Sequence, residues 1–187
     1  MPLKAHLIEA RNRLFISLGA LVVTTVVGII FHKTVLSYLV KIAQDAGAEV
    51  NYGSAVSPLD IAIKVSLWIG VVLASPVIIY QIWAYIVPGL KKRERRISLA
   101  FICVTVPLFI GGVVLGVLVI PHALTFFASL TATGSVFLLS IQDFLPFVIR
   151  LTLAFGVAMI VPVMMVGLNL IGILLACLIM KYWRITV

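Results

Sequence analysis

Acidic residues are scarce in this chain, and so are charged residues in general. Of the 187 residues, 6 are Asp or Glu and 14 are Lys or Arg. Charged residues make up 11% of the sequence, whereas 63% are hydrophobic and the mean hydropathy is +1.26. So little polar surface cannot cover a water-soluble globule of this size. The composition therefore excludes a soluble globular protein and predicts an integral membrane protein.

Residue patterns typical of metal sites and of enzymes are also missing. The cysteines, Cys103 and Cys177, lie in apolar runs without a second cysteine or a histidine at metal-binding spacing. The sequence has no HExxH motif and no Gly-rich phosphate-binding loop, and no acidic residue lies in the middle of an apolar run. We therefore expect a non-enzymatic protein with no metal and no cofactor.

Long apolar runs, in contrast, fill most of the sequence. A membrane-spanning helix needs about 20 mostly apolar residues. The predicted spans cover residues 14–31, 65–87, 97–120 and 144–170. We therefore predict a single domain over residues 1–187 whose fold class is all-α, a polytopic transmembrane helix bundle of about four spans.

The distribution of basic residues predicts how the bundle is oriented, because basic residues in short loops resist translocation. Residues 91–96 contain five cations and one acid, and residues 1–13 contain three cations and one acid. The segment 123–143 has no Lys or Arg, and the loop expected at 32–63 has two lysines against three acids. We therefore expect a multi-pass protein of the cytoplasmic (cell inner) membrane with both termini cytoplasmic. Topology and anionic lipid explain the net charge of +8, so we expect no nucleic-acid partner.

Three motifs occur in order along the chain: HLIEARNRL at residues 6–14, SPLDIAIKVSL at 57–67 and PVIIYQIWAYIVPGLKKRERR at 76–96. With these motifs the chain resembles TatC, the receptor subunit of the twin-arginine (Sec-independent) protein translocase. LAFGVAMIVPV at 153–163 is similar to the fourth helix of that family. The family has six spans, so the resemblance implies a TatC homologue that lacks the last two transmembrane helices.

The resemblance implies a binding site for signal peptides that carry two consecutive arginines. The implied site residues are Glu9 and Glu94, which supply complementary charge on the cytoplasmic face, with Arg11 and Arg95 beside them. A carboxylate pairs well with guanidinium, which can donate two parallel hydrogen bonds. The residues alone leave another interpretation open, in which Glu9 pairs with Arg13 four residues further along the helix and Glu94 only moderates a basic loop.

The magnitude of an ion pair limits what these carboxylates can contribute. A fully solvated pair is worth about 0–1 kcal/mol, whereas micromolar binding needs roughly 8 kcal/mol. We therefore expect the acidic site to lie next to an apolar groove, which would bind the hydrophobic segment of the signal peptide and provide most of the affinity.

A second polar site is implied within the second predicted span. In the family, the glutamine at the position of Gln81, next to Tyr80, belongs to a polar cluster that contacts TatA- and TatB-type single-span subunits. The family pattern also places a glutamate where this chain has Ile160. The resemblance therefore implies partner contact at Gln81 and Tyr80, but without the carboxylate from the fourth helix.

Proline, glycine and aromatic residues suggest how the spans pack. Pro76 and Pro162 fall inside predicted spans, where each removes a backbone hydrogen bond, and Pro88 belongs to the central motif. Gly112 and Gly116 form a GxxxG pattern, which permits close helix contact within the subunit or, alternatively, in a homo-oligomer. Several aromatic residues near span ends are interpreted as membrane-interface anchors, namely Trp68, Trp83, Tyr85 and Trp183.

These observations favour a receptor or core subunit of the twin-arginine translocase, which by family analogy exports folded proteins with energy from the proton-motive force. Two alternatives stay open. One is a small membrane channel or secondary transporter with Lys64, Asp143 and Arg150 as pathway charges, although both cations can also snorkel to lipid headgroups. The other is a truncated TatC homologue without export activity.

Overall fold

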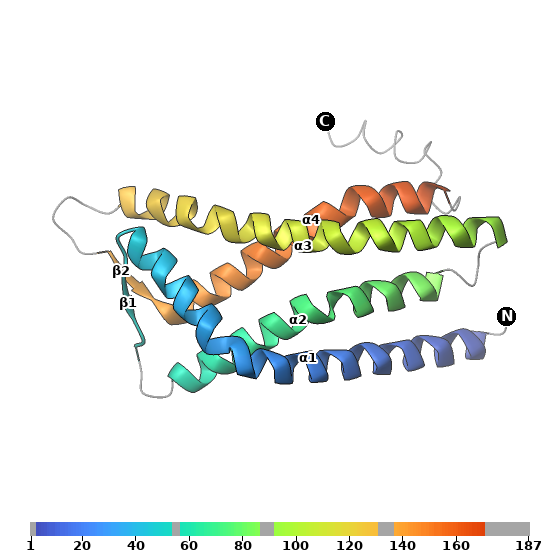
Figure 1. The fold of residues 1–187 in the computed structure, drawn as a ribbon, viewed down its shortest axis with the longest axis horizontal. Coiled ribbons are helices and arrows are strands. Elements are labelled where there is room, and N and C mark those ends of the chain that lie inside the picture. Colours follow the sequence, from blue (N-terminus) through green and yellow to red (C-terminus); the bar gives the residue numbers. More distant parts are fainter. Residues whose placement is uncertain (1–2, 54–56, 87–91, 131–136, 171–187) are drawn as a thin grey trace.

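The computed structural model consists of long helices joined to a very small sheet (Figure 1). The described residues form four helices, α1 (Leu3–Asp45), α2 (Ser57–Ile86), α3 (Lys92–Ser129) and α4 (Ile141–Leu170). They also form two strands, β1 (Glu49–Asn51) and β2 (Leu138–Ser140), which pair in parallel. The backbone is described for residues 3–53, 57–86, 92–130 and 137–170, and side chains for residues 7–53, 57–85, 101–130 and 137–166.

Each of these helices is long and apolar enough to cross a membrane. Their outer faces carry large exposed apolar side chains, such as Val22, Val26 and Ile30 on α1. Leaving such surface in water costs roughly 25 cal/mol per Å², a cost that surrounding lipid removes. For the described residues, the predicted all-α transmembrane bundle is therefore confirmed, with the pair of short strands as an addition.

Helix α1 is much longer than the span predicted at residues 14–31. The expectation of a loop from residue 32 onward is wrong, because the helix continues to Asp45. Leu39 and Ala43 lie one turn apart on its second half and are fully buried in the core, so packing holds this part in a helix despite its charges. The chain then turns at Gly47, which has a φ of +84° and whose N–H donates to the Gln44 carbonyl oxygen at 2.9 Å.

The helices form two antiparallel hairpins, α1 with α2 and α3 with α4 (Figure 1). We call the end that carries β1 and β2 the sheet end, and the opposite end, where α1 begins, the N-terminal end. Within the first hairpin the backbones approach closely at Gly28, where an added Cβ would overlap the carbonyl oxygen of Ser66 and lie 3.1 Å from its Cα. The Thr24 hydroxyl lies 2.9 Å from the Gly70 carbonyl oxygen, to which it can donate. Small residues therefore allow α1 to dock on α2.

The GxxxG pattern brings α3 against α4. A Cβ added to Gly112 would lie 2.6 Å from the Phe155 carbonyl oxygen, and one added to Gly116 would lie 2.7 Å from Thr152 Cα. Both glycines are buried in the described structure. The interpretation of this pattern as packing within the subunit is therefore confirmed.

Pro76 lies inside α2 and Pro162 inside α4, in the predicted positions. A proline in a helix has no N–H for the carbonyl four residues earlier, which for Pro76 is the carbonyl of Val72. The Ser75 hydroxyl donates to the Val72 oxygen at 2.7 Å. A neighbouring side chain thus satisfies the backbone acceptor that the proline leaves free, as a membrane interior requires. Pro88 lies outside the described residues.

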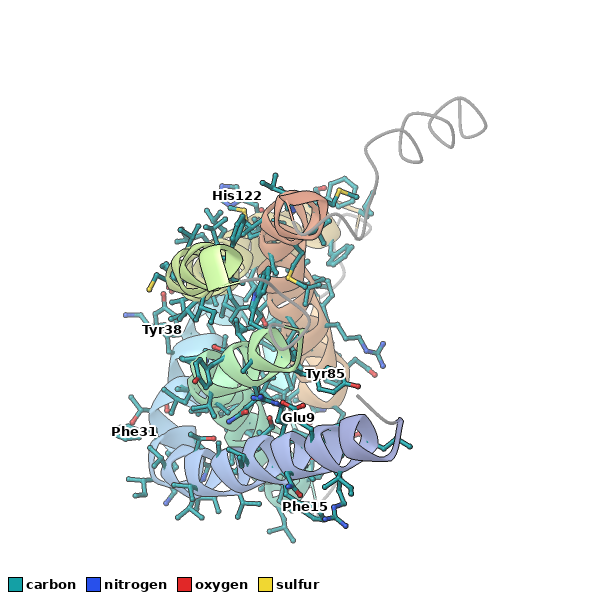
Figure 2. The ribbon with its side chains drawn as sticks, turned by 90° about the vertical axis from the view of Figure 1, so that its right-hand side faces the viewer. Glu9, Phe15, Phe31, Tyr38, Tyr85 and His122 are labelled. Carbon is teal, nitrogen blue, oxygen red and sulfur yellow. The ribbon has the colours of Figure 1, made fainter. Side chains whose placement is uncertain are left out.

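Two tryptophans predicted to anchor the protein at the membrane interface are buried instead. Trp68 is 8% exposed and Trp83 is 1% exposed. Trp68 Nε1 donates to Thr152 Oγ1 at 3.1 Å and so joins α2 to α4. The interfacial interpretation fails because helix packing turns these rings toward the neighbouring hairpin. Trp183 lies outside the described residues, and Tyr85 is half-buried on α2 at the N-terminal end (Figure 2).

The Trp68–Thr152 hydrogen bond is expected to stabilise the contact between the hairpins. We expect the double-mutant cycle of Trp68→Phe and Thr152→Val to show a coupling energy of about 0.5–1.5 kcal/mol, typical of one hydrogen bond. Unfolding by SDS titration in mixed micelles measures the free energy of unfolding for the four proteins of the cycle. Strictly additive effects would show that the two side chains stabilise the fold independently.

Candidate functional site

A half-buried ion pair lies on the first turns of α1. Arg13 Nη2 donates to Glu9 Oε1 at 2.7 Å, and Arg13 Nε donates to the same oxygen at 3.2 Å. The two side chains are 24% and 28% exposed. Their spacing of four residues places them on one helix face. The local pairing of Glu9 with Arg13, which the sequence left open as an alternative, is therefore present in the structure.

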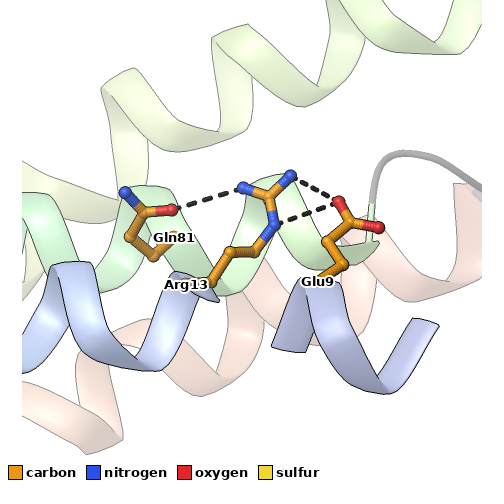
Figure 3. Close-up of polar contacts among 3 residues, drawn as sticks. All are labelled: Glu9, Arg13 and Gln81. Carbon is orange, nitrogen blue, oxygen red and sulfur yellow. Dashed lines mark hydrogen bonds and ion pairs between the residues drawn. The ribbon is translucent and has the colours of Figure 1, made fainter. Parts of the chain in front are cut away.

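Arg13 also reaches the neighbouring helix. Its Nη1 donates to Gln81 Oε1 on α2 at 3.3 Å, so one guanidinium group bridges Glu9 and Gln81 (Figure 3). Glu9 lies on the side of α1 that faces α2, whereas Phe15 points away from the bundle (Figure 2). We call Glu9, Arg13 and Gln81 the polar triad. It joins α1 to α2 near the N-terminal end.

The predicted site residues are only partly brought together. Arg11 is exposed outside the triad, where its Nη2 contacts Asn12 Oδ1 at 3.4 Å. Tyr80 is 49% exposed on a different face of α2 from Gln81. Glu94 and Arg95 belong to the first turn of α3, and their side chains lie outside those described. The structure thus gathers Glu9 with Gln81, which were predicted to belong to different sites, through Arg13.

An apolar groove of about 320 Å³ lies between the N-terminal-end halves of α3 and α4. Its lining side chains are Phe101, Val104, Pro162, Val163 and Val166. The groove belongs to the second hairpin, whereas the triad belongs to the first. Both lie toward the same end of the bundle, because α3 begins and α4 ends there (Figure 1).

Ile160 occupies the position where the family pattern has a glutamate. It is half-buried and packs against an apolar cluster that includes Trp83 and Phe109. Trp83 stacks on Phe101 with ring centroids 5.6 Å apart, and in the described structure its buried indole N–H has no hydrogen-bond acceptor. Isoleucine therefore acts here as a packing residue between the hairpins.

The charges proposed for a channel do not line a continuous path. Lys64 Nζ donates to Asp60 Oδ2 at 2.7 Å on the surface of α2. Asp143 and Arg150 are exposed and line a separate groove of about 540 Å³ toward the sheet end. Among the described side chains none that is charged is buried. In the same part of the chain no three His, Cys, Asp or Glu side chains are grouped as a metal site would require.

The apolar helices with exposed apolar faces, and the polar triad at one end, define a multi-pass membrane protein of the helix-bundle class. The family model described as Sec-independent protein translocase protein (TatC) matches residues 5–187. The chain belongs to the TatC family.

Curated relatives support this assignment over nearly the whole chain. A TatC protein of Xylanimonas cellulosilytica is 43% identical over 98% of this chain and 69% of its own length. One from Rothia mucilaginosa is 30% identical over 98% of this chain and 65% of its length, and TatCy of Bacillus subtilis is 31% identical over 92% and 69%. The chain thus spans about two thirds of the length of these relatives.

A solved structure shares the fold. The crystal structure of the twin-arginine translocase receptor TatC superposes with a TM-score of 0.83 at 33% identity, covering 90% of this chain and 76% of that one. The predicted resemblance to TatC is therefore confirmed by both sequence and structure.

Proposed function

We propose that this chain is the signal-peptide receptor of a twin-arginine translocase in the cytoplasmic membrane, with Glu9 as one of its guanidinium-binding groups. One observation carries this proposal: the half-buried Glu9 carboxylate already binds a guanidinium group, that of Arg13, at 2.7 Å. A site that holds an arginine of its own chain has the chemistry to hold an arginine of a cargo peptide.

The positions of the two acids support a shared site. Glu9 lies near the start of α1 and Glu94 near the start of α3, and both helices begin at the N-terminal end (Figure 1). The segment 91–96 and the first 13 residues are rich in basic residues, which favours a cytoplasmic location for this end. Both carboxylates would then face the compartment in which cargo is folded.

Apolar contact is expected to supply most of the affinity. A hydrogen bond to a charged group contributes about 1.5–3 kcal/mol, which is only part of the roughly 8 kcal/mol of micromolar binding. The groove lined by Phe101 and Val166 offers an apolar volume of about 320 Å³ at the same end. We assign to it the hydrophobic segment of the signal peptide, while Glu9 and Glu94 select the arginine pair.

The remaining parts of the proposal come from the family. We propose that TatA- and TatB-type single-span subunits assemble with the chain and that the proton-motive force drives export. The exposed apolar faces of the helices offer surface to lipid, to such single-span helices or to a second copy of the chain.

Peptide crosslinking tests the proposal directly. A photoreactive residue at Asn12, which is exposed beside Glu9, reports on binding of peptides with two arginines or two lysines in membranes that contain this chain. We expect Glu9→Gln combined with Glu94→Gln to reduce the preference for the arginine peptide roughly 10- to 100-fold, because charge-assisted hydrogen bonds are lost. Glu49→Gln, which changes an exposed acid on β1 at the sheet end, is the matched control. An unchanged preference in the double variant would mean that these acids are not the site.

A further inference from the structure

The polar triad has an asymmetry that bears on recognition. Two nitrogens of Arg13 donate to the same oxygen of Glu9, and the third donates to Gln81. The other oxygen, Oε2, receives none of these bonds and is directed away from Arg13 (Figure 3). An ionised carboxylate can accept about four hydrogen bonds, so Glu9 can bind a second guanidinium without releasing the first.

We propose that Arg13 and Gln81 are positioning residues for signal-peptide recognition, and that they hold Glu9 so that Oε2 is presented to an arginine of the peptide. This inference rests on the proposed function. Gln81 thereby takes part in the cytoplasmic recognition site, reached through Arg13, in addition to the contact with single-span partner subunits that the family resemblance implies.

The electrostatics of the triad explain how it selects arginine over lysine. Arg13 neutralises most of the charge of Glu9, so a cation of any shape gains little from Coulomb attraction alone. A ligand must instead make directional hydrogen bonds to Oε2. A planar guanidinium with five N–H donors does so better than a compact, strongly hydrated ammonium group. The selectivity then depends on the orientation of the carboxylate.

Gln81 supplies the restraint that orients the carboxylate. Arginine and glutamate side chains on a helix surface have many rotamers, and fixing them costs conformational entropy. The hydrogen bond from Arg13 Nη1 to Gln81 Oε1 at 3.3 Å restrains the guanidinium before the peptide binds. The entropy of ordering Arg13 and Glu9 is therefore already lost in the free protein. Gln81 accepts this bond without adding charge, so the triad keeps its near-neutral balance.

Selectivity measurements on single variants test this role. The intact chain in nanodiscs is titrated with labelled peptides that carry two arginines or two lysines, and the ratio of the two Kd values is the selectivity. We expect Arg13→Gln and Gln81→Leu each to lower the selectivity about 3- to 10-fold, the value of one or two hydrogen bonds. Gln81→Glu keeps an acceptor for Arg13 but adds a negative charge, so we expect it to bind both peptides more tightly and to be less selective than the wild type.

A matched control separates positioning from general helix docking. Thr24→Val removes a different hydrogen bond between α1 and α2, the one from Thr24 to the Gly70 carbonyl. We expect it to leave the selectivity unchanged. An equal loss in Thr24→Val would reduce Gln81 to a structural contact and overturn the inference.

Two further outcomes have distinct meanings. If Arg13→Gln raises the affinity for the arginine peptide at unchanged selectivity, Arg13 is a competitor for Glu9 and the positioning role is wrong. If the wild-type chain itself shows no preference for arginine, the proposed function fails, and the inference with it. A wild-type preference that survives in both Arg13→Gln and Gln81→Leu overturns the inference alone.

Discussion

Gly112→Leu is expected to push α3 away from α4 and to lower the free energy of unfolding by about 3 kcal/mol or more. A Cβ at this position would lie 2.6 Å from the Phe155 carbonyl oxygen and 2.8 Å from Gly156 Cα. Both are backbone atoms, so no side chain can rotate away to make room. Overpacking in a tight core costs typically about 1–3 kcal/mol, and a leucine against a helix backbone belongs at or above the upper end of that range.

The neighbouring glycine provides a matched control for this prediction. An added Cβ at Gly111 meets nothing within 4 Å, so Gly111→Leu adds the same side chain one residue away in open space. We expect Gly111→Leu to be as stable as wild type or slightly more stable, because leucine favours helix over glycine by about 0.5–1 kcal/mol. The measurement is the free energy of unfolding in mixed micelles. Similar losses for both variants would contradict the assignment of Gly112 to the helix contact.

Gly28→Leu is expected to have a comparably large effect, and it acts on the first hairpin and on the site together. A Cβ there would overlap the backbone carbonyl oxygen of Ser66 and lie 3.1 Å from the Cα and carbonyl carbon of that residue. Displacing α1 from α2 would both lower the free energy of unfolding and lengthen the bond from Arg13 to Gln81, which is 3.3 Å. The selectivity for arginine peptides should therefore fall together with stability.

Gly19→Leu is the control on the same helix, since an added Cβ at Gly19 meets nothing within 4 Å. We expect this variant to keep both stability and selectivity. Peptide titration and unfolding are measured on the same preparations. A Gly28→Leu protein that loses stability but keeps full selectivity would show that recognition does not need α1 docked on α2.

Much of the fold could be predicted from hydropathy alone, because four apolar runs long enough to span a bilayer leave few alternatives. The positions at which the helices end could not be predicted from hydropathy. Lys33, Lys41 and Asp45 indicated a loop, yet they lie on a helix whose other face buries Leu39 and Ala43. The pairing of β1 with β2 joins segments almost 90 residues apart, such as Glu49 and Leu138, and three-residue strands carry no periodic signal of their own.

In the candidate site, too, local contacts could be predicted from the sequence and long-range contacts could not. The motif around Glu9 pointed to a carboxylate that binds guanidinium, and the spacing of four residues indicated the pair with Arg13. The contact of Arg13 with Gln81 joins residues 68 positions apart, and no local pattern reports it. Likewise, the sequence placed Trp68 at a membrane interface because indole rings favour that position, whereas its N–H finds an acceptor in Thr152 inside the bundle.

The links between the two hairpins differ along the length of the bundle. Toward the sheet end the hairpins are joined by hydrogen bonds, from Trp68 to Thr152, from Gln142 to Ser57 and between β1 and β2. Toward the N-terminal end Trp83 meets Phe101 by ring stacking. Hydrogen bonds fix both the distance and the direction between two groups, whereas apolar packing depends on how closely the two surfaces fit. The two hairpins are therefore tied by directional bonds at the sheet end, whereas at the end that carries Glu9 and the apolar groove they meet through the packed cluster of Ile79, Trp83, Phe109 and Val113.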